Sequence, residues 1–135
     1  MYEFLDHPSE QLIRVTTASI DDVFRESAMA LFELMTDTER LIDDSSYQFN
    51  LENDDRALLL IDWLNRLILL HEVEHVFLND FQVLVRPQWM LDAKVKGQKI
   101  VDGVERRLHV KSATYGQLQW NETPQGHQVE FVVDL

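Results

Sequence analysis

Cysteine is absent from the sequence, and glycine and proline are scarce, with four glycines and three prolines among 135 residues. Without cysteine the chain forms no disulfide, and any bound metal would take carboxylate, imidazole, carbonyl or water ligands. The same absence fits a reducing compartment. The four glycines form no glycine-rich motif of the kind that cradles phosphates. Stability and chemistry therefore have to come from a hydrophobic core and from oxygen and nitrogen groups.

Basic residues are half as numerous as acidic ones: 12 Lys and Arg stand against 24 Asp and Glu, and the formal net charge is −12. This charge opposes the phosphate backbone that dominates nucleic-acid affinity, so direct RNA or DNA binding is disfavoured. The acidity suits a basic protein partner, and it also serves solubility alone. No hydrophobic run is long enough to span a membrane, and residues 1–10 lack the features of a signal peptide. We therefore expect a cytoplasmic protein that does not enter membranes.

The length and the hydrophobic content, 45% of residues, suit a single domain over residues 1–135. Apolar residues recur at spacings of three and four over residues 20–35, behind the N-cap candidate Ser19, and predict an amphipathic helix. Residues 55–70 are apolar on nearly every side and predict a second, mostly buried helix. Polar residues 37–46 predict a loop.

Period-two alternation of apolar and polar residues predicts that the rest of the chain is mainly β-sheet. The predicted strands are residues 12–15, 47–51, 81–85, 89–95 and 129–133. Residues 100–120 contain further strand-like pieces, with Gly103 and Gly116 as turn or bulge candidates. Together these elements predict an α+β fold in which two helices pack on a mainly antiparallel or mixed sheet.

Residues 71–75 read HEVEH, which matches the zinc motif H-E-x-x-H. In that motif His71 and His75 would hold zinc and Glu72 would act as general base. The chemistry requires both histidines inside one helix and a third ligand from a later element. Here the predicted helix ends near residue 70, and residues 76–80 are typical of a strand or turn. A solvated helix end is the favoured interpretation, and a zinc-dependent hydrolase stays as the alternative.

Five segments spread over the whole chain form a recognisable series. They are YEFLDH at 2–7, DVFRESAMALFELMTD at 22–37, LLLIDWLNRLILL at 58–70, KSATYGQLQW at 111–120 and VEFVVDL at 129–135. In their order and spacing, the sequence resembles the archease family. The resemblance implies an archease-like fold and a non-catalytic role.

In that role an archease is the protein cofactor of a GTP-dependent RNA ligase. The ligase joins RNA ends that bear a 2′,3′-cyclic phosphate or 3′-phosphate to 5′-hydroxyl ends in tRNA splicing and RNA repair. The resemblance implies that this protein promotes guanylylation and turnover of the ligase. An interaction module that has kept the fold and lost the ligase role is a further alternative.

The family also binds a divalent cation, typically calcium, between an N-terminal H-T-A-D motif and a C-terminal pair of aspartate and an apolar residue. This sequence reads HPSE at residues 7–10 and ends in Asp134 and Leu135. The resemblance therefore implies Glu10, Asp134 and the main-chain oxygens of Leu135, which as final residue carries the terminal carboxylate, as metal ligands. A glutamate can supply one or two oxygens to such an ion, but its extra methylene predicts a weaker or altered site.

Four further residues are secondary candidates. Asp6 and His7 are close to Glu10 in sequence, while Lys111 and Tyr115 match the family's K-A-x-T-Y segment, in which a glycine here replaces the frequent histidine that follows. Tyr115 also suits a core aromatic, and Lys111 a solvated strand residue. Residues 97–110 lack the family's Asp-Pro-x-Arg-His loop, so docking on a ligase is expected to differ.

Overall fold

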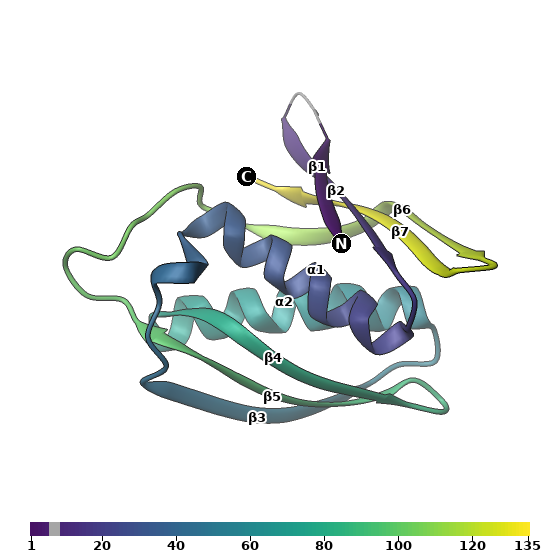
Figure 1. The fold of residues 1–135 in the computed structure, drawn as a ribbon, viewed down its shortest axis with the longest axis horizontal. Helices are drawn as coiled ribbons and strands as arrows, with labels where there is room; N and C mark the ends of the chain where they lie inside the picture. Colours follow the sequence, from purple (N-terminus) through teal and green to yellow (C-terminus); the bar gives the residue numbers. More distant parts are fainter. Residues whose placement is uncertain (6–8) are drawn as a thin grey trace.

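Two helices occupy the middle layer of the fold, with one antiparallel β-sheet on either side of them (Figure 1). The structure is a computed structural model that describes residues 1–5 and 9–135. In chain order the elements are β1 (Tyr2–Leu5), β2 (Glu10–Thr17), α1 (Ile20–Met35), the 3₁₀ turn η1 (Thr38–Arg40), β3 (Ser45–Glu52), α2 (Arg56–Glu74), β4 (Val76–Arg86), β5 (Met90–Lys99), β6 (Ser112–Thr123) and β7 (Gly126–Asp134). The predicted α+β fold with two helices is confirmed, and its strands divide between two sheets.

Strands from the two ends of the chain pair with each other. One sheet has the order β1-β2-β7-β6 and the other has the order β3-β5-β4. β2 and β7 pair along their full lengths, from Glu10 opposite Asp134 to Thr17 opposite His127. The first sheet is therefore held together by contacts between residues that are far apart in sequence.

Helix α1 begins at the residue that the sequence predicts. The Ser19 side chain caps it by accepting a hydrogen bond from the Asp22 backbone N–H at 3.2 Å. Asp21 and Asp22 lie in the first turn, where negative charge interacts favourably with the helix dipole. Asp21 also accepts a hydrogen bond from the Val85 backbone N–H at 2.8 Å, which ties this end of the helix to β4.

Helix α2 is buried around Trp63, as its apolar sequence predicts. The Trp63 side chain is fully buried and packs against the rings of Phe49 and Phe81. Its indole N–H donates to the Phe24 carbonyl oxygen of α1 at 2.9 Å, so the buried polar atom has a partner. Asp55 caps the helix through hydrogen bonds from two backbone N–H groups.

The end of α2 differs from the prediction. The helix continues to Glu74 instead of ending near residue 70, because the polar residues of its last turn have tertiary support. His71 packs on Phe77, and the Lys99 ammonium donates to the Glu74 carbonyl oxygen at 3.0 Å. His75 then adopts a left-handed conformation with φ of 53° and turns the chain directly into β4.

Residues 100–111 form an irregular connection, whereas the sequence predicts strand-like pieces there. The backbone N–H groups of Arg107 and Leu108 donate to the carbonyl oxygens of Met35 and Leu34 at 2.8 and 3.0 Å. These bonds replace strand pairing, because they satisfy carbonyls at the end of α1 that have no partner within the helix. Gly103 lies in a turn with φ of 93°.

Strand β6 carries the irregularity for which Gly116 is the candidate. The register of β6 against β7 shifts between Thr114 and Gln119, and Gly116 lies within this shift. β1 has no counterpart among the predicted strands. Within the described ranges 1–5 and 9–135, no helix is long and apolar enough to cross a membrane.

Candidate functional site

Three polar side chains form a row across β2, β7 and β6. The register places Asp134 directly opposite Glu10 on one side and opposite Ser112 on the other. Directly opposed residues of adjacent strands project from the same face of a sheet. The flanking Val133 is buried on the core side, so Asp134 and its two neighbours face away from the core. We refer to Glu10, Asp134 and Ser112 as the Asp134 row.

The Asp134 row concentrates oxygen ligands. The Ser112 hydroxyl donates to Asp134 Oδ2 at 3.2 Å, and the Lys111 backbone N–H donates to the Asp134 carbonyl oxygen at 2.8 Å. Opposed residues of an antiparallel pair have Cα atoms about 4.5 to 5.5 Å apart, and like charges at such positions repel. A hard divalent cation between Glu10 and Asp134 would remove this repulsion and would find the carboxylate oxygens that it prefers.

Of the other residues predicted from the sequence, some are direct sequence neighbours of this row and others are not. Leu135, which is 37% exposed, directly follows Asp134, and the exposed Lys111 directly precedes Ser112. Tyr115 is 51% exposed in the irregular part of β6 and is therefore not a core aromatic. Asp6 and His7 lie outside the described residues.

Ser112 is the member of the row that sequence reasoning missed. Its only signal in the sequence is that it directly follows Lys111 in the KSATY segment discussed above. Among the residues that the structure describes, no group of three or more His, Cys, Asp and Glu side chains could hold a metal ion. A cation at the Asp134 row would therefore need main-chain oxygens, such as that of Leu135, and water as further ligands.

The next two rows along this face contain no uncompensated pair of carboxylates. Leu12, Val132 and Thr114 form a mainly apolar row beside the Asp134 row. Beyond it Arg14 pairs with Glu130 at 2.8 Å. The charge of Glu130 is thus balanced by a cation on the neighbouring strand.

The HEVEH segment does not have the geometry of a zinc-hydrolase motif. His71 lies within α2, but His75 is the residue at which the helix ends in a left-handed conformation. The two histidines are therefore not successive positions on one helical face, which is what the motif requires. The His71 Nδ1 atom lies 2.8 Å from the Val76 carbonyl oxygen, and the ring stacks on Phe77 with centroids 5.1 Å apart.

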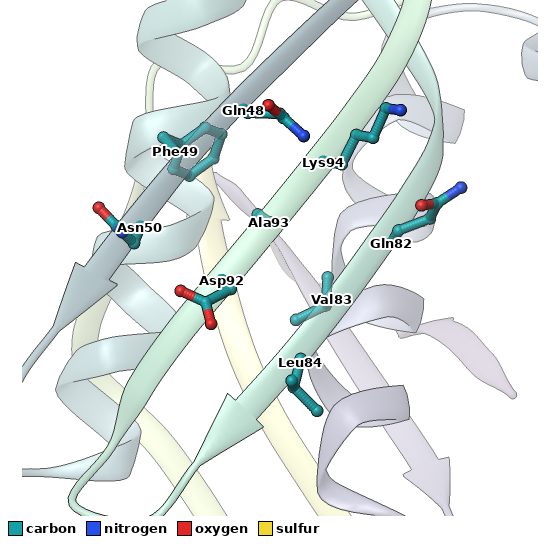
Figure 2. A pocket seen from close by; sticks show the side chains of 9 residues that line it. All are labelled: Gln48, Phe49, Asn50, Gln82, Val83, Leu84, Asp92, Ala93 and Lys94. Carbon is teal, nitrogen blue, oxygen red and sulfur yellow. The ribbon is translucent and has the colours of Figure 1, made fainter.

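A shallow hollow of about 630 Å³ lies on the outer face of the β3-β5-β4 sheet, away from both helices (Figure 2). Toward one end of this hollow Lys94 lies between Gln48 and Gln82 on the neighbouring strands. None of the candidate residues predicted from the sequence lies there. The hollow is a broad polar trough that contains one cation and one carboxylate, Asp92.

Almost the whole chain matches the model of a known protein family. The model of the archease protein family (MTH1598/TM1083) matches residues 2–135. The chain belongs to the archease family. The archease of Methanosarcina barkeri is 29% identical over 139 residues, which cover 99% of this chain and 95% of that protein. An archease of Saccharolobus islandicus is 30% identical over 136 residues, which cover 99% of this chain and 98% of that protein.

Solved structures have the same archease fold. The solution structure of Methanobacterium thermoautotrophicum protein 1598 matches with a TM-score of 0.88 and 28% identity, over 99% of this chain and 98% of that one. The crystal structure of an archease from Thermotoga maritima, described as a possible chaperone, matches with a TM-score of 0.70 over 97% of this chain and 94% of that one. Its sequence identity is 14%, so this second likeness concerns the fold alone.

Proposed function

We propose that this archease is a non-catalytic protein cofactor of a GTP-dependent RNA ligase, and that it promotes ligase guanylylation and turnover in tRNA splicing or RNA repair. Membership of the family over residues 2–135 supports the proposal, because this is the role that the resemblance to archeases implies. The description of the Thermotoga maritima archease as a possible chaperone is consistent with a protein that acts on another protein.

The proposed role includes a divalent cation, with calcium as the first candidate, at the Asp134 row. The observation that carries this part is the register of β2 and β7, which sets Glu10 opposite Asp134. The carboxylates of Glu10 and Asp134 and the main-chain oxygen of Leu135 would hold the ion. When bound, a hard cation would neutralise the two carboxylates and could accept an oxygen ligand from a partner. The longer side chain of Glu10 is expected to give a weaker site than aspartate.

Acceleration of a ligase by a protein cofactor requires differential binding. A partner raises the rate of guanylylation only if it binds the activated conformation or the transition state more tightly than the resting ligase. The net charge of −12 suits docking on an enzyme whose RNA-binding surface is basic, because complementary charge increases the rate of encounter. The protein then needs no RNA contact of its own.

The test is the rate of ligase guanylylation and of multiple-turnover ligation of a 3′-phosphate RNA, with and without this protein. The informative variant is Asp134→Asn, because it removes the charge while keeping the shape of the side chain and the acceptor for Ser112. Asp43→Ala is the matched control, because Asp43 is an exposed acid in the connection before β3. We expect wild type and Asp43→Ala to accelerate both reactions, and Asp134→Asn to lose most of the effect.

Calcium binding provides a readout that does not depend on the ligase. An ion that binds only the folded protein raises Tm by mass action, so calcium should raise the Tm of wild type and not that of Asp134→Asn. An active ligase whose rate is unchanged by this protein would contradict the cofactor role. If calcium also leaves the wild-type Tm unchanged, the interaction module without a ligase role becomes the better description.

A further inference from the structure

Three histidines of the chain line one pocket at the end of α2. The pocket has a volume of about 320 Å³, and its lining consists of His71, Glu72, His75, Ile100, Arg106 and His109. It lies between the last turn of α2 and the irregular connection that leads to β6. Pockets of about 300 Å³ and more are large enough for small ligands.

Arg106 contributes a guanidinium group to this pocket. Its neighbour Arg107 is bound by the carboxylates of Glu33 and Glu105. Within residues 1–5 and 9–135, Arg106 takes part in no ion pair, and Glu72 is the single carboxylate of the lining. A guanidinium of this kind is the usual partner of phosphate groups, because its planar set of N–H donors matches two phosphate oxygens.

The end of helix α2 would ordinarily repel an anion, because the helix dipole is negative there. Here its carbonyl groups are partly satisfied: Lys99 Nζ donates to the Glu74 carbonyl oxygen at 3.0 Å, and the Ile100 N–H donates to that of His75 at 2.8 Å. The charge of this lysine is balanced by the Glu74 carboxylate at 3.5 Å, so the benefit to an anion comes from the satisfied carbonyl oxygens. The local obstacle to an anion is therefore reduced.

The imidazole of His71 is held in one orientation inside the pocket. Because a carbonyl oxygen only accepts hydrogen bonds, the contact of 2.8 Å with Val76 makes Nδ1 the donor. The ring stacks on Phe77 and meets the edge of Phe32, with centroid distances of 5.1 and 6.3 Å. Nε2 of this fixed ring is the nitrogen left to interact with a ligand.

We propose that this pocket binds a phosphate group, either inorganic phosphate or a small phosphate monoester, through Arg106, His75, His109 and Nε2 of His71. The alternative of a preformed zinc centre does not fit, because no three metal-ligating side chains of the described residues are arranged to hold an ion. The site uses none of the residues of the Asp134 row, and it stands or falls independently of the ligase role.

Phosphate binding at this site should depend on pH. Burial lowers the pKa of His71. The positive charges of His109 and Arg106 lower this pKa further, whereas the hydrogen bond to the Val76 carbonyl and the charge of Glu72 raise it. A bound dianion would favour the protonated form of His71 and raise its pKa. The affinity for the dianion should therefore increase as the pH falls and His71 takes up a proton, whereas protonation of the phosphate itself, with a second pKa of about 6 for a monoester, opposes this effect.

The experiment is a phosphate titration followed by the imidazole proton resonances in NMR spectra, with chloride exchanged for phosphate at constant ionic strength. We expect saturable shifts of the resonances of His71, His75 and His109, with no comparable shift for His127, which bonds to Trp120 on β6. Inorganic phosphate and glycerol 2-phosphate are titrated separately. Tighter binding of one of them tells whether the pocket suits the free ion or a phosphorylated molecule.

Two arginine variants separate a specific site from a general charge effect. Arg106→Ala should weaken phosphate binding about tenfold or more, because a charge-assisted bidentate pair is lost. Arg25→Ala removes the same charge from an exposed position on α1 and should leave the affinity unchanged. The proposal is overturned if no saturable shift occurs, or if Arg106→Ala and Arg25→Ala bind phosphate as wild type does.

Discussion

The substitution Asn65→Leu should remove a contact that closes the edge of the β1-β2-β7-β6 sheet. Asn65 is one of the few polar residues in the middle of α2, and its side chain makes two hydrogen bonds with the backbone of Ala113 on the edge strand β6. Asn65 Nδ2 donates to the Ala113 carbonyl oxygen at 3.1 Å, and the Ala113 N–H donates to Asn65 Oδ1 at 2.8 Å. The side chain thus takes the place of one residue of a neighbouring strand.

Leucine has the same number and branching of side-chain heavy atoms as asparagine, although it is bulkier, and it cannot make either bond. Ala113 is 4% exposed, so water reaches its backbone groups poorly once Asn65 is replaced. Each buried polar group without a partner costs about 1 to 3 kcal/mol, and leucine recovers a few tenths through its higher helix propensity. We expect the free energy of unfolding to fall by about 3 kcal/mol.

Urea denaturation followed by tryptophan fluorescence measures this loss directly. Asn121→Leu serves as the matched control, because Asn121 is exposed on the same strand and should change stability by no more than about 0.5 kcal/mol. The m-value should stay constant, since the variants expose similar surface on unfolding. A loss below about 1 kcal/mol for Asn65→Leu would show that the two bonds have no net effect, and the reasoning from backbone satisfaction would fail.

Three further predictions test other parts of the fold. Gly97→Ala should cost more than about 3 kcal/mol in the same assay, since its Cβ would overlap the Phe77 carbonyl oxygen, whereas Gly116→Ala faces open space and should change stability little. Asp55→Ala removes the N-cap of α2 and should cost about 1 kcal/mol; an unchanged midpoint would show that water replaces the cap. Burial lowers the pKa of His71, so the unfolded chain binds a proton at this histidine more readily than the folded protein does, and stability falls as the pH drops through the ordinary histidine pKa. The decrease in Tm between about pH 7.5 and 5.5 should therefore be smaller in His71→Gln than in wild type. Equal decreases in the two proteins would contradict this prediction.

Local signals in the sequence predict both helices well. The cap at Ser19 and the spacing of apolar residues identify α1 to the residue, because capping and amphipathic burial act over a few neighbours. The predicted end of α2 near residue 70 is wrong because it depends on contacts that are not local in sequence. The last turn of α2 is polar in sequence. It is supported by the packing of His71 on Phe77 of β4, and a local sequence pattern does not show where that strand lies.

The candidate site could be predicted only in part. The resemblance to archeases points to Glu10 and Asp134, and the structure sets these two residues opposite each other. Ser112 joins them through the pairing of β6 with β7, which periodicity alone does not specify. The roles of Asn65 and of the irregular connection at residues 100–111 are equally non-local, because each satisfies backbone groups of a distant element. Metal binding itself stays a prediction.

The central position of β2 between β1 and β7 has a consequence for how this protein is made. Arg14 and Glu130, which pair across β2 and β7, are 116 residues apart in the chain. During synthesis the helices and the β3-β5-β4 sheet leave the ribosome long before β7 does, so one edge of β2 waits without a partner. An unpaired strand edge is a template for association with other chains. The Asp134 row forms only when β7 pairs with β2. A nascent chain therefore cannot bind a partner through this row before the fold is complete.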